Sequence, residues 1–366
     1  MEQLKAFLKR KNIVISAKRY GIDALGAMAQ GLFCSLLIGT IINTLGEQMG
    51  VPFLVDVGRY ASAMSGAAMA VAIGYALQAP PLVLFSLVTV GYAANALGST
   101  SLIPDQAGAG GPLAVLFIAV IAAEFGKAVS KETKIDILVT PLVTILVGVG
   151  LSAWWAPAIG TAATAVGNII MWATDLQPFL MGIVVSVVIG VALTLPISSA
   201  AICAAFGLTG LAGGAAVAGC CANMVGFAVL SFRENRWGGL VSQGLGTSML
   251  QMPNIVRNPR IWLPAILTSA ITGPLATCVF HLEMNGPPVS SGMGTCGLVG
   301  QIGVWTGWLA PSERAIANGA VAITPGVMDW AGLILISFVL PAILCWAFGL
   351  FFRRIGWIKA GDLTLE

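Results

Sequence analysis

The feature that most constrains this chain is a succession of long apolar runs, with nearly all of its charge confined to the short segments between them. Only 9% of the 366 residues are charged and 57% are hydrophobic, whereas an ordinary soluble domain has about 25% charged residues. Since a membrane-spanning helix needs roughly 20 apolar residues, the length allows about ten spans with short connections. The sequence therefore predicts an all-α polytopic membrane protein whose surroundings are the lipid bilayer.

The apolar runs give the expected positions of the regular spans. We expect spans at about 22–46, 53–77, 80–98, 113–130, 137–156, 178–195, 261–280 and 331–351. The segment 158–175 is less hydrophobic than its neighbours and is predicted to be an interfacial helix or a short connector. The first run is too long for the apolar region of a signal peptide, so it is interpreted as a retained span.

The basic residues predict the orientation of the chain. They gather at the N-terminus, in the loop around Lys131, and at the C-terminus around Arg353. By the positive-inside rule we expect these three places, and so both termini, on the cytoplasmic side of the cell membrane, with the 99–106 loop outside. Residues 1–19 mix six cations with apolar residues, which favours an amphipathic helix on the membrane surface; the alternative is a plain cytoplasmic tail. The scattered cations, with a net charge of +3, do not indicate a nucleic-acid partner.

Two stretches are apolar but too rich in glycine for straight spans. Residues 197–231 contain Gly207, Gly210, Gly213 and Gly214, and both flanks are expected on the cytoplasmic side. This pattern favours a re-entrant helical hairpin with its tip among these glycines, or two short glycine-hinged helices, over one straight crossing. Residues 237–258 are predicted to be equally irregular.

The segment 281–301 is the main candidate for a binding site. Its prolines and glycines prevent a regular helix and leave backbone polar groups free. Polar side chains that can bind a hydroxylated or anionic solute accompany them, and Asn223 of the preceding glycine-rich stretch is added to the same candidate site. The predicted substrate-binding residues are His281, Glu283, Asn285, Ser290, Ser291 and Asn223. The alternative is an extracellular loop whose polar residues only face water.

Other motifs are few. Asp56 with Arg59, and Glu124 with Lys127, are three residues apart and are expected to share a helix face. The chain has one histidine and seven cysteines without metal-ligand spacing, so we expect no metal, no cofactor, and cysteines that serve as packing residues. No phosphate-loop or hydrolase motif is found. We therefore assign no catalytic residue.

The order of these features resembles the membrane IIC component of the phosphotransferase system. The resemblance rests on the basic start, five spans, the glycine-broken stretch, Asn-Pro-Arg at 258–260, and Gly-Pro-Pro-Val-Ser-Ser-Gly-Met-Gly-Thr at 286–295. The chain is similar in particular to the stand-alone IIC group that includes perfringolysin-regulator-type membrane proteins. The Gly-Ile-Thr-Glu-Pro motif of the glucose-type group is absent, so the solute is not identified.

The resemblance implies a homodimeric transporter of a small polar solute, sugar or sugar-like, that works by an elevator-like displacement. It implies an interfacial segment at 1–19, a scaffold and dimerisation domain at 20–175, and a transport domain with re-entrant hairpins at 176–366. Glu283 and His281 would contact the solute. Separate IIA and IIB proteins would carry out any phosphorylation, so the chain is at most the permease part of a sugar phosphotransferase. The alternatives are a membrane sensor or regulator that binds without turnover, and an ion-coupled carrier.

Overall fold

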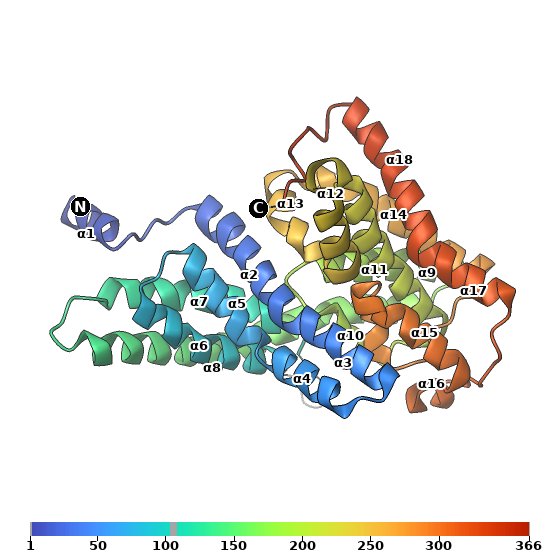
Figure 1. The fold of residues 1–366 in the computed structure, drawn as a ribbon, viewed down its shortest axis with the longest axis horizontal. Coiled ribbons are helices and arrows are strands. Elements are labelled where there is room, and N and C mark those ends of the chain that lie inside the picture. Colours follow the sequence, from blue (N-terminus) through green and yellow to red (C-terminus); the bar gives the residue numbers. More distant parts are fainter. Residues whose placement is uncertain (1, 103–107, 366) are drawn as a thin grey trace. The chain divides into compact units, whose positions relative to one another are not determined.

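The computed structural model describes residues 2–102 and 108–365, and every regular element in this part of the chain is a helix (Figure 1). The expected all-α class is therefore confirmed for these residues. The 99–106 loop lies partly outside them. The chain divides into two compact units, one up to Ala163 and one from Thr164 onward, so the division falls inside a single long helix, α8.

The first unit begins with a short helix and continues with long antiparallel neighbours. A continuous helix runs from Arg19 to Met49 and contains two π-helical turns. Helix α2 follows the first of these turns, and helix α3 follows the second. It ends at Gly50 in the left-handed conformation. The α-helices are α1 (Glu2–Arg10), α2 (Ala24–Leu32), α3 (Ile38–Met49), α4 (Pro52–Ala63), α5 (Ser65–Ala76), α6 (Pro81–Gly98), α7 (Gly111–Val129) and α8 (Asp136–Thr174).

The second unit is organised around one buried helix. This is α11 (Gly210–Leu230), which packs against α9, α14 and α18. The other α-helices are α9 (Pro178–Thr194), α10 (Ser199–Ala205), α12 (Phe232–Val241), α13 (Met252–Arg257), α14 (Leu263–Pro274), α15 (Val299–Leu309), α16 (Glu313–Ala317), α17 (Val327–Ile334) and α18 (Leu340–Arg354). The predicted irregularity of 237–258 is confirmed, because π and 3-10 turns lie between α12 and α13.

Seven helical segments among the described residues are long and apolar enough to cross a membrane, so the chain is a multi-pass membrane protein. They are Arg19–Met49, Pro81–Gly98, Gly111–Val129, Asp136–Thr174, Gly210–Leu230, Pro259–Val279 and Val327–Arg354. Two further apolar helices, Ser65–Ala76 and Pro178–Thr194, are shorter.

Two expectations about the first half of the chain were wrong. The run 53–77 is broken at Met64, which leaves the helical conformation and separates α4 from α5. The two halves have different partners, because α4 packs against α3 whereas α5 packs against α2 and α6. For 158–175 we expected an interfacial helix or a short connector, and the segment is indeed helical, but it is the last part of α8 and not a separate element. Its alanines favour helix whether or not the segment is strongly hydrophobic.

Ion pairs and hydrogen bonds attach the basic N-terminal segment to the end of the first unit that is predicted to face the cytoplasm. Lys11 pairs with Glu132 at 2.5 Å and also donates to the Ser130 carbonyl, and Arg10 pairs with Glu132 at 2.7 Å. Lys127, which is almost fully buried, donates to the Asn12 carbonyl at 2.8 Å. These contacts hold residues 10–12 against the loop that follows α7.

The two residue pairs that were expected to share a helix face both form ion pairs, in different surroundings. Glu124 and Lys127 lie 2.9 Å apart at a nearly buried position, where Tyr20 also donates to Glu124 at 3.1 Å. Asp56 and Arg59 lie 3.6 Å apart at the surface of α4. Exposed pairs of this kind contribute about 0–1 kcal/mol.

We predict that Glu132→Gln releases the N-terminal segment at neutral pH. The hydrogen bond from Lys11 is the largest cause that holds the pKa of the Glu132 carboxyl below its usual value. The stabilisation is therefore present above the ordinary glutamate pKa and is lost as the pH falls through the lowered one. Trypsin should cleave after Arg10 faster in the variant than in the wild type.

The control is Asp56→Asn, which removes a carboxylate from a surface pair on α4. It should leave the rate of cleavage after Arg10 unchanged. Equal rates for wild type and Glu132→Gln would mean that these ion pairs do not hold the segment.

Candidate functional site

The glycine-rich stretch contains a turn between a short helix and a long one. Helix α10 ends at Ala205 and α11 begins at Gly210. Gly207 and Gly210 have φ values of 61° and 64°, in the left-handed region that glycine adopts without a steric penalty. The turn lies within the predicted tip. Ser198 caps α10 by accepting from the Ala201 backbone N–H at 3.1 Å.

The 281–287 segment lies directly against the start of α11. Gly210 and Met284 exchange two backbone hydrogen bonds of 3.0 Å each, as residues of neighbouring antiparallel strands do. The Gly210 N–H also approaches the Asn285 Oδ1 at 3.2 Å. At Gly214, a β-carbon would lie 1.7 Å from the Leu282 carbonyl oxygen. The structure therefore brings together the two irregular stretches that the sequence singled out separately.

Ser290 and Ser291, which follow shortly after residues 281–287, are buried. Ser291 donates to the Leu208 carbonyl at 2.7 Å, which ties the segment to the turn before α11. Ser290 is packed against Gly303, where an added β-carbon would meet the Ser290 β-carbon at 2.5 Å. A third serine, Ser199 of α10, donates to the Gly292 carbonyl at 2.8 Å.

Exposed polar side chains lie beside this buried frame. His281 and Glu283 are exposed, and His281 has a positive φ of 45°. Asn285 is 5% exposed, and its side-chain amide donates to Glu283 Oε2 at 2.8 Å. Because the Asn285 amide oxygen faces the Gly210 N–H, this asparagine links the carboxylate to the start of α11. The arrangement is a carboxylate held by a buried amide, with an imidazole two residues away in the chain.

Three further polar residues adjoin this site. Asn318 donates to Thr209 at 3.2 Å, and the Ser312 N–H donates to the Asn285 carbonyl at 2.8 Å. Arg314 covers Gly207, where an added β-carbon would lie 2.5 Å from the guanidinium Nε. None of these residues was predicted from the sequence. The available signal is a polar stretch at 312–318 with a helix-capping serine, between two apolar helices.

Asn223 lies apart from these residues. It is thirteen positions after Gly210 on α11, which at ~1.5 Å per residue is about 20 Å along the axis. It is fully buried: its amide donates to Gly219 and Ser269, and its oxygen accepts from Trp262 at 3.0 Å and from Thr194 at 3.3 Å. The amide thus links α11 to α9, α14 and the turn before α14.

Within the described residues, no group of three His, Cys, Asp or Glu side chains is placed to hold a metal ion. Cys203 and Cys296 are buried. Thiols in such surroundings stay protonated and are poor nucleophiles at neutral pH. The site has groups for binding a polar solute.

Comparison with known families gives one match that covers nearly the whole chain. A family model described as "Phosphotransferase system, EIIC" matches residues 22–365. Comparisons with curated proteins and with solved structures found no match.

We predict that Gly214→Ala destabilises the second unit whereas Gly244→Ala does not. The added β-carbon at 214 would meet the backbone carbonyl of Leu282, but at 244 its nearest neighbour would be Ala228 at an ordinary 3.5 Å. Overpacking typically costs about 1–3 kcal/mol. Thermal unfolding of the purified proteins in detergent should show a lower midpoint for Gly214→Ala alone. Equal midpoints would mean that 282 does not lie against α11.

Proposed function

The chain belongs to the phosphotransferase-system EIIC family, and from this premise we propose that it translocates a small polar solute, a sugar or sugar-like molecule. The solute would bind at the polar site formed by His281, Glu283 and Asn285 beside the start of α11. Separate IIA and IIB proteins would phosphorylate it, because the chain itself has no phosphate-loop or hydrolase motif.

The observation that carries the proposal is the contact of the 281–287 segment with the turn before α11. A hydroxylated solute needs acceptors and donors at fixed positions, and a few well-placed polar groups give such a site its specificity. Glu283 provides an ionised acceptor, and Asn285 restrains it through a 2.8 Å hydrogen bond. His281 adds a group that can donate or accept. Ser290 and Ser291 act indirectly, because both are buried and Ser291 donates to the Leu208 carbonyl.

We assign the candidate residues different parts in this function. Glu283 and His281 contact the solute, and Asn285 positions Glu283. Asn223, whose amide is fully hydrogen-bonded inside the second unit, acts by holding α11 among its neighbours. Thr209, Arg314 and Asn318 lie around the same turn and are further candidates for solute contact.

The transport cycle that we propose is elevator-like. Residues 20–175 form the scaffold and the homodimer contact, and residues 176–366 move with the solute, with 197–231 as a re-entrant hairpin. Residues 1–19 lie on the cytoplasmic surface of the cell membrane, and both termini face the cytoplasm. The division into two compact units supports this assignment.

We predict that Glu283→Gln weakens solute binding about tenfold or more, because hydrogen bonds to a charged group contribute about 1.5–3 kcal/mol each. His281→Ala should weaken it as well. Binding is measured by isothermal calorimetry on purified protein, with a panel of sugars and sugar acids to find the solute first.

The matched control is Glu47→Gln. Glu47 is an exposed glutamate that also accepts a 2.8 Å hydrogen bond from an asparagine of its own segment, Asn43. It lies on α3 in the first unit, so the substitution should leave affinity unchanged. Unchanged affinity in both Glu283→Gln and His281→Ala would remove this segment from the solute site.

Uptake into reconstituted vesicles distinguishes the proposal from its alternatives. Uptake that depends on added IIA and IIB proteins supports phosphotransfer. Uptake driven by an imposed ion gradient without them would identify an ion-coupled carrier. Binding without uptake under either condition would identify a sensor or regulator.

A further inference from the structure

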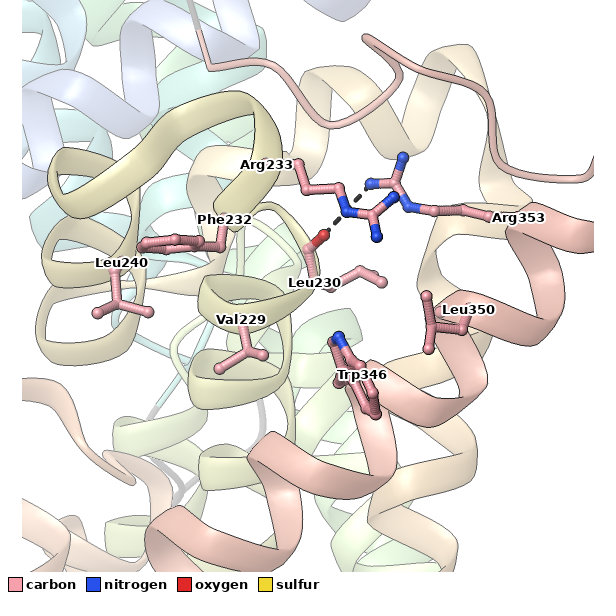
Figure 2. Close-up of a pocket in the computed structure, with 9 residues that line it drawn as sticks. Val229, Leu230, Phe232, Arg233, Leu240, Trp346, Leu350 and Arg353 are labelled. Atoms are coloured by element: carbon pink, nitrogen blue, oxygen red, sulfur yellow. Dashed lines mark hydrogen bonds between the residues drawn. The ribbon is translucent and has the colours of Figure 1, made fainter.

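A pocket lies at the other end of α11 from the candidate solute site. Twenty residues separate Gly210 from Leu230, which corresponds to about 30 Å of helix. The pocket has a volume of about 260 Å³ and lies between α11, α12 and α18 (Figure 2). Its walls are mostly apolar, with Trp346 and Leu350 on one side and Val229 and Leu240 on the other.

The helix ends place this pocket at the boundary between the apolar layer and water. Two candidate spans end here, Gly210–Leu230 and Val327–Arg354. Along α18, Trp346, Leu350 and Arg353 follow at intervals of four and three, so they share one helix face. That face changes from apolar to basic towards the helix end. The same change occurs from Val229 to Arg233 on the opposite wall.

Two arginines line the basic end of the pocket, and a single carboxylate pairs with one of them. Arg353 contacts Glu234 at 2.8 Å and donates to the Leu230 carbonyl (Figure 2). Arg233 is exposed and forms no ion pair with any residue that the structure describes. The pocket therefore keeps one uncompensated positive charge beside an apolar wall. An anion with an attached hydrocarbon chain matches both the positive charge and the apolar wall.

Aromatic residues near the pocket also agree with a position at the boundary between the apolar layer and water. Trp346 is half exposed on the pocket wall, and Trp237 is exposed and packs edge-on against Phe232, which also lines the pocket. Tryptophans with one apolar and one wet side are typical of the headgroup level of a bilayer, and arginines there attract anionic lipids.

We propose that this pocket binds an anionic phospholipid. Its phosphate contacts Arg233, and one acyl chain lies along Trp346 and Leu350. A lipid anchored here would contact both α11 and α18, so it would stabilise the second unit in the membrane.

The test measures lipid-dependent stability of the purified protein in detergent. Phosphatidylglycerol should raise the midpoint of thermal unfolding of the wild type, and phosphatidylcholine should raise it less. Arg233→Gln should weaken the phosphatidylglycerol response about tenfold in lipid concentration, as expected for losing one charged hydrogen-bonding group. Trp346→Ala should weaken it through the acyl chain, and its half-exposed side chain makes the substitution compatible with folding.

The matched control is Arg354→Gln. Arg354 is the exposed neighbour of Arg353 at the same end of α18, but it does not line the pocket. It should leave the response within twofold of the wild type. An equal loss in Arg233→Gln and Arg354→Gln would show attraction to general surface charge and would overturn the proposal.

Two further measurements distinguish an anionic lipid from other ligands of the pocket. Inorganic phosphate and glycerol 3-phosphate should not reproduce the stabilisation, because they lack the hydrocarbon chain. Stabilisation by phosphate alone at equal concentration would mean a simple anion site, and equal responses to phosphatidylglycerol and phosphatidylcholine would remove the role of charge. Either result would overturn the proposal.

Discussion

The second unit depends on pairing the backbone groups that its many helix breaks leave free. A buried polar backbone group without a partner is costly, and irregular backbone in a membrane protein persists only where protein or water satisfies it. Here Gly210 and Met284 pair with each other, while side chains of Ser291 and Ser199 donate to the Leu208 and Gly292 carbonyls. The same device holds the C-terminal tail, because the Leu363 carbonyl accepts from Asn235 of α12 and from Gln251 of the irregular stretch after α12. The serines and amides of this unit are thus required by its glycines and prolines.

Hydropathy located the long helices well because a continuous apolar run has few alternatives to a span or a buried helix. It failed where a helix boundary depends on partners. Nothing local marks Met64 as a break, since the break follows from α4 packing on α3 while α5 packs on α2 and α6. It failed also at 158–175, because a decrease in hydrophobicity does not end a helix of alanine-rich sequence.

For the candidate site, the same dependence on tertiary partners explains why the surroundings of Asn285 were easier to predict from sequence than those of Asn223. Both are asparagines next to apolar sequence, and both are buried. Asn285 lies in a stretch whose prolines forbid helix, so its placement outside a regular helix followed from local sequence. The partners of Asn223 come from Thr194, Trp262 and Ser269, at sequence distances of 29, 39 and 46. Such a network is decided by tertiary packing, and residue type alone does not distinguish it from a solute contact.

The central position of α11 connects these observations. Its N-terminal end holds the turn that contacts Met284 and Asn285, its middle is fixed by Asn223, and its C-terminal end borders the pocket with Arg233 and Arg353. A helix buried along most of its length moves only together with the neighbours packed on it, here α9, α14 and α18. In the elevator-like cycle that we propose, a displacement of the candidate site along the membrane normal would therefore carry the basic pocket with it. The charge at that pocket would then have to remain among headgroups or pay the cost of entering the apolar layer. This condition would limit how far the second unit can move while the proposed lipid stays bound.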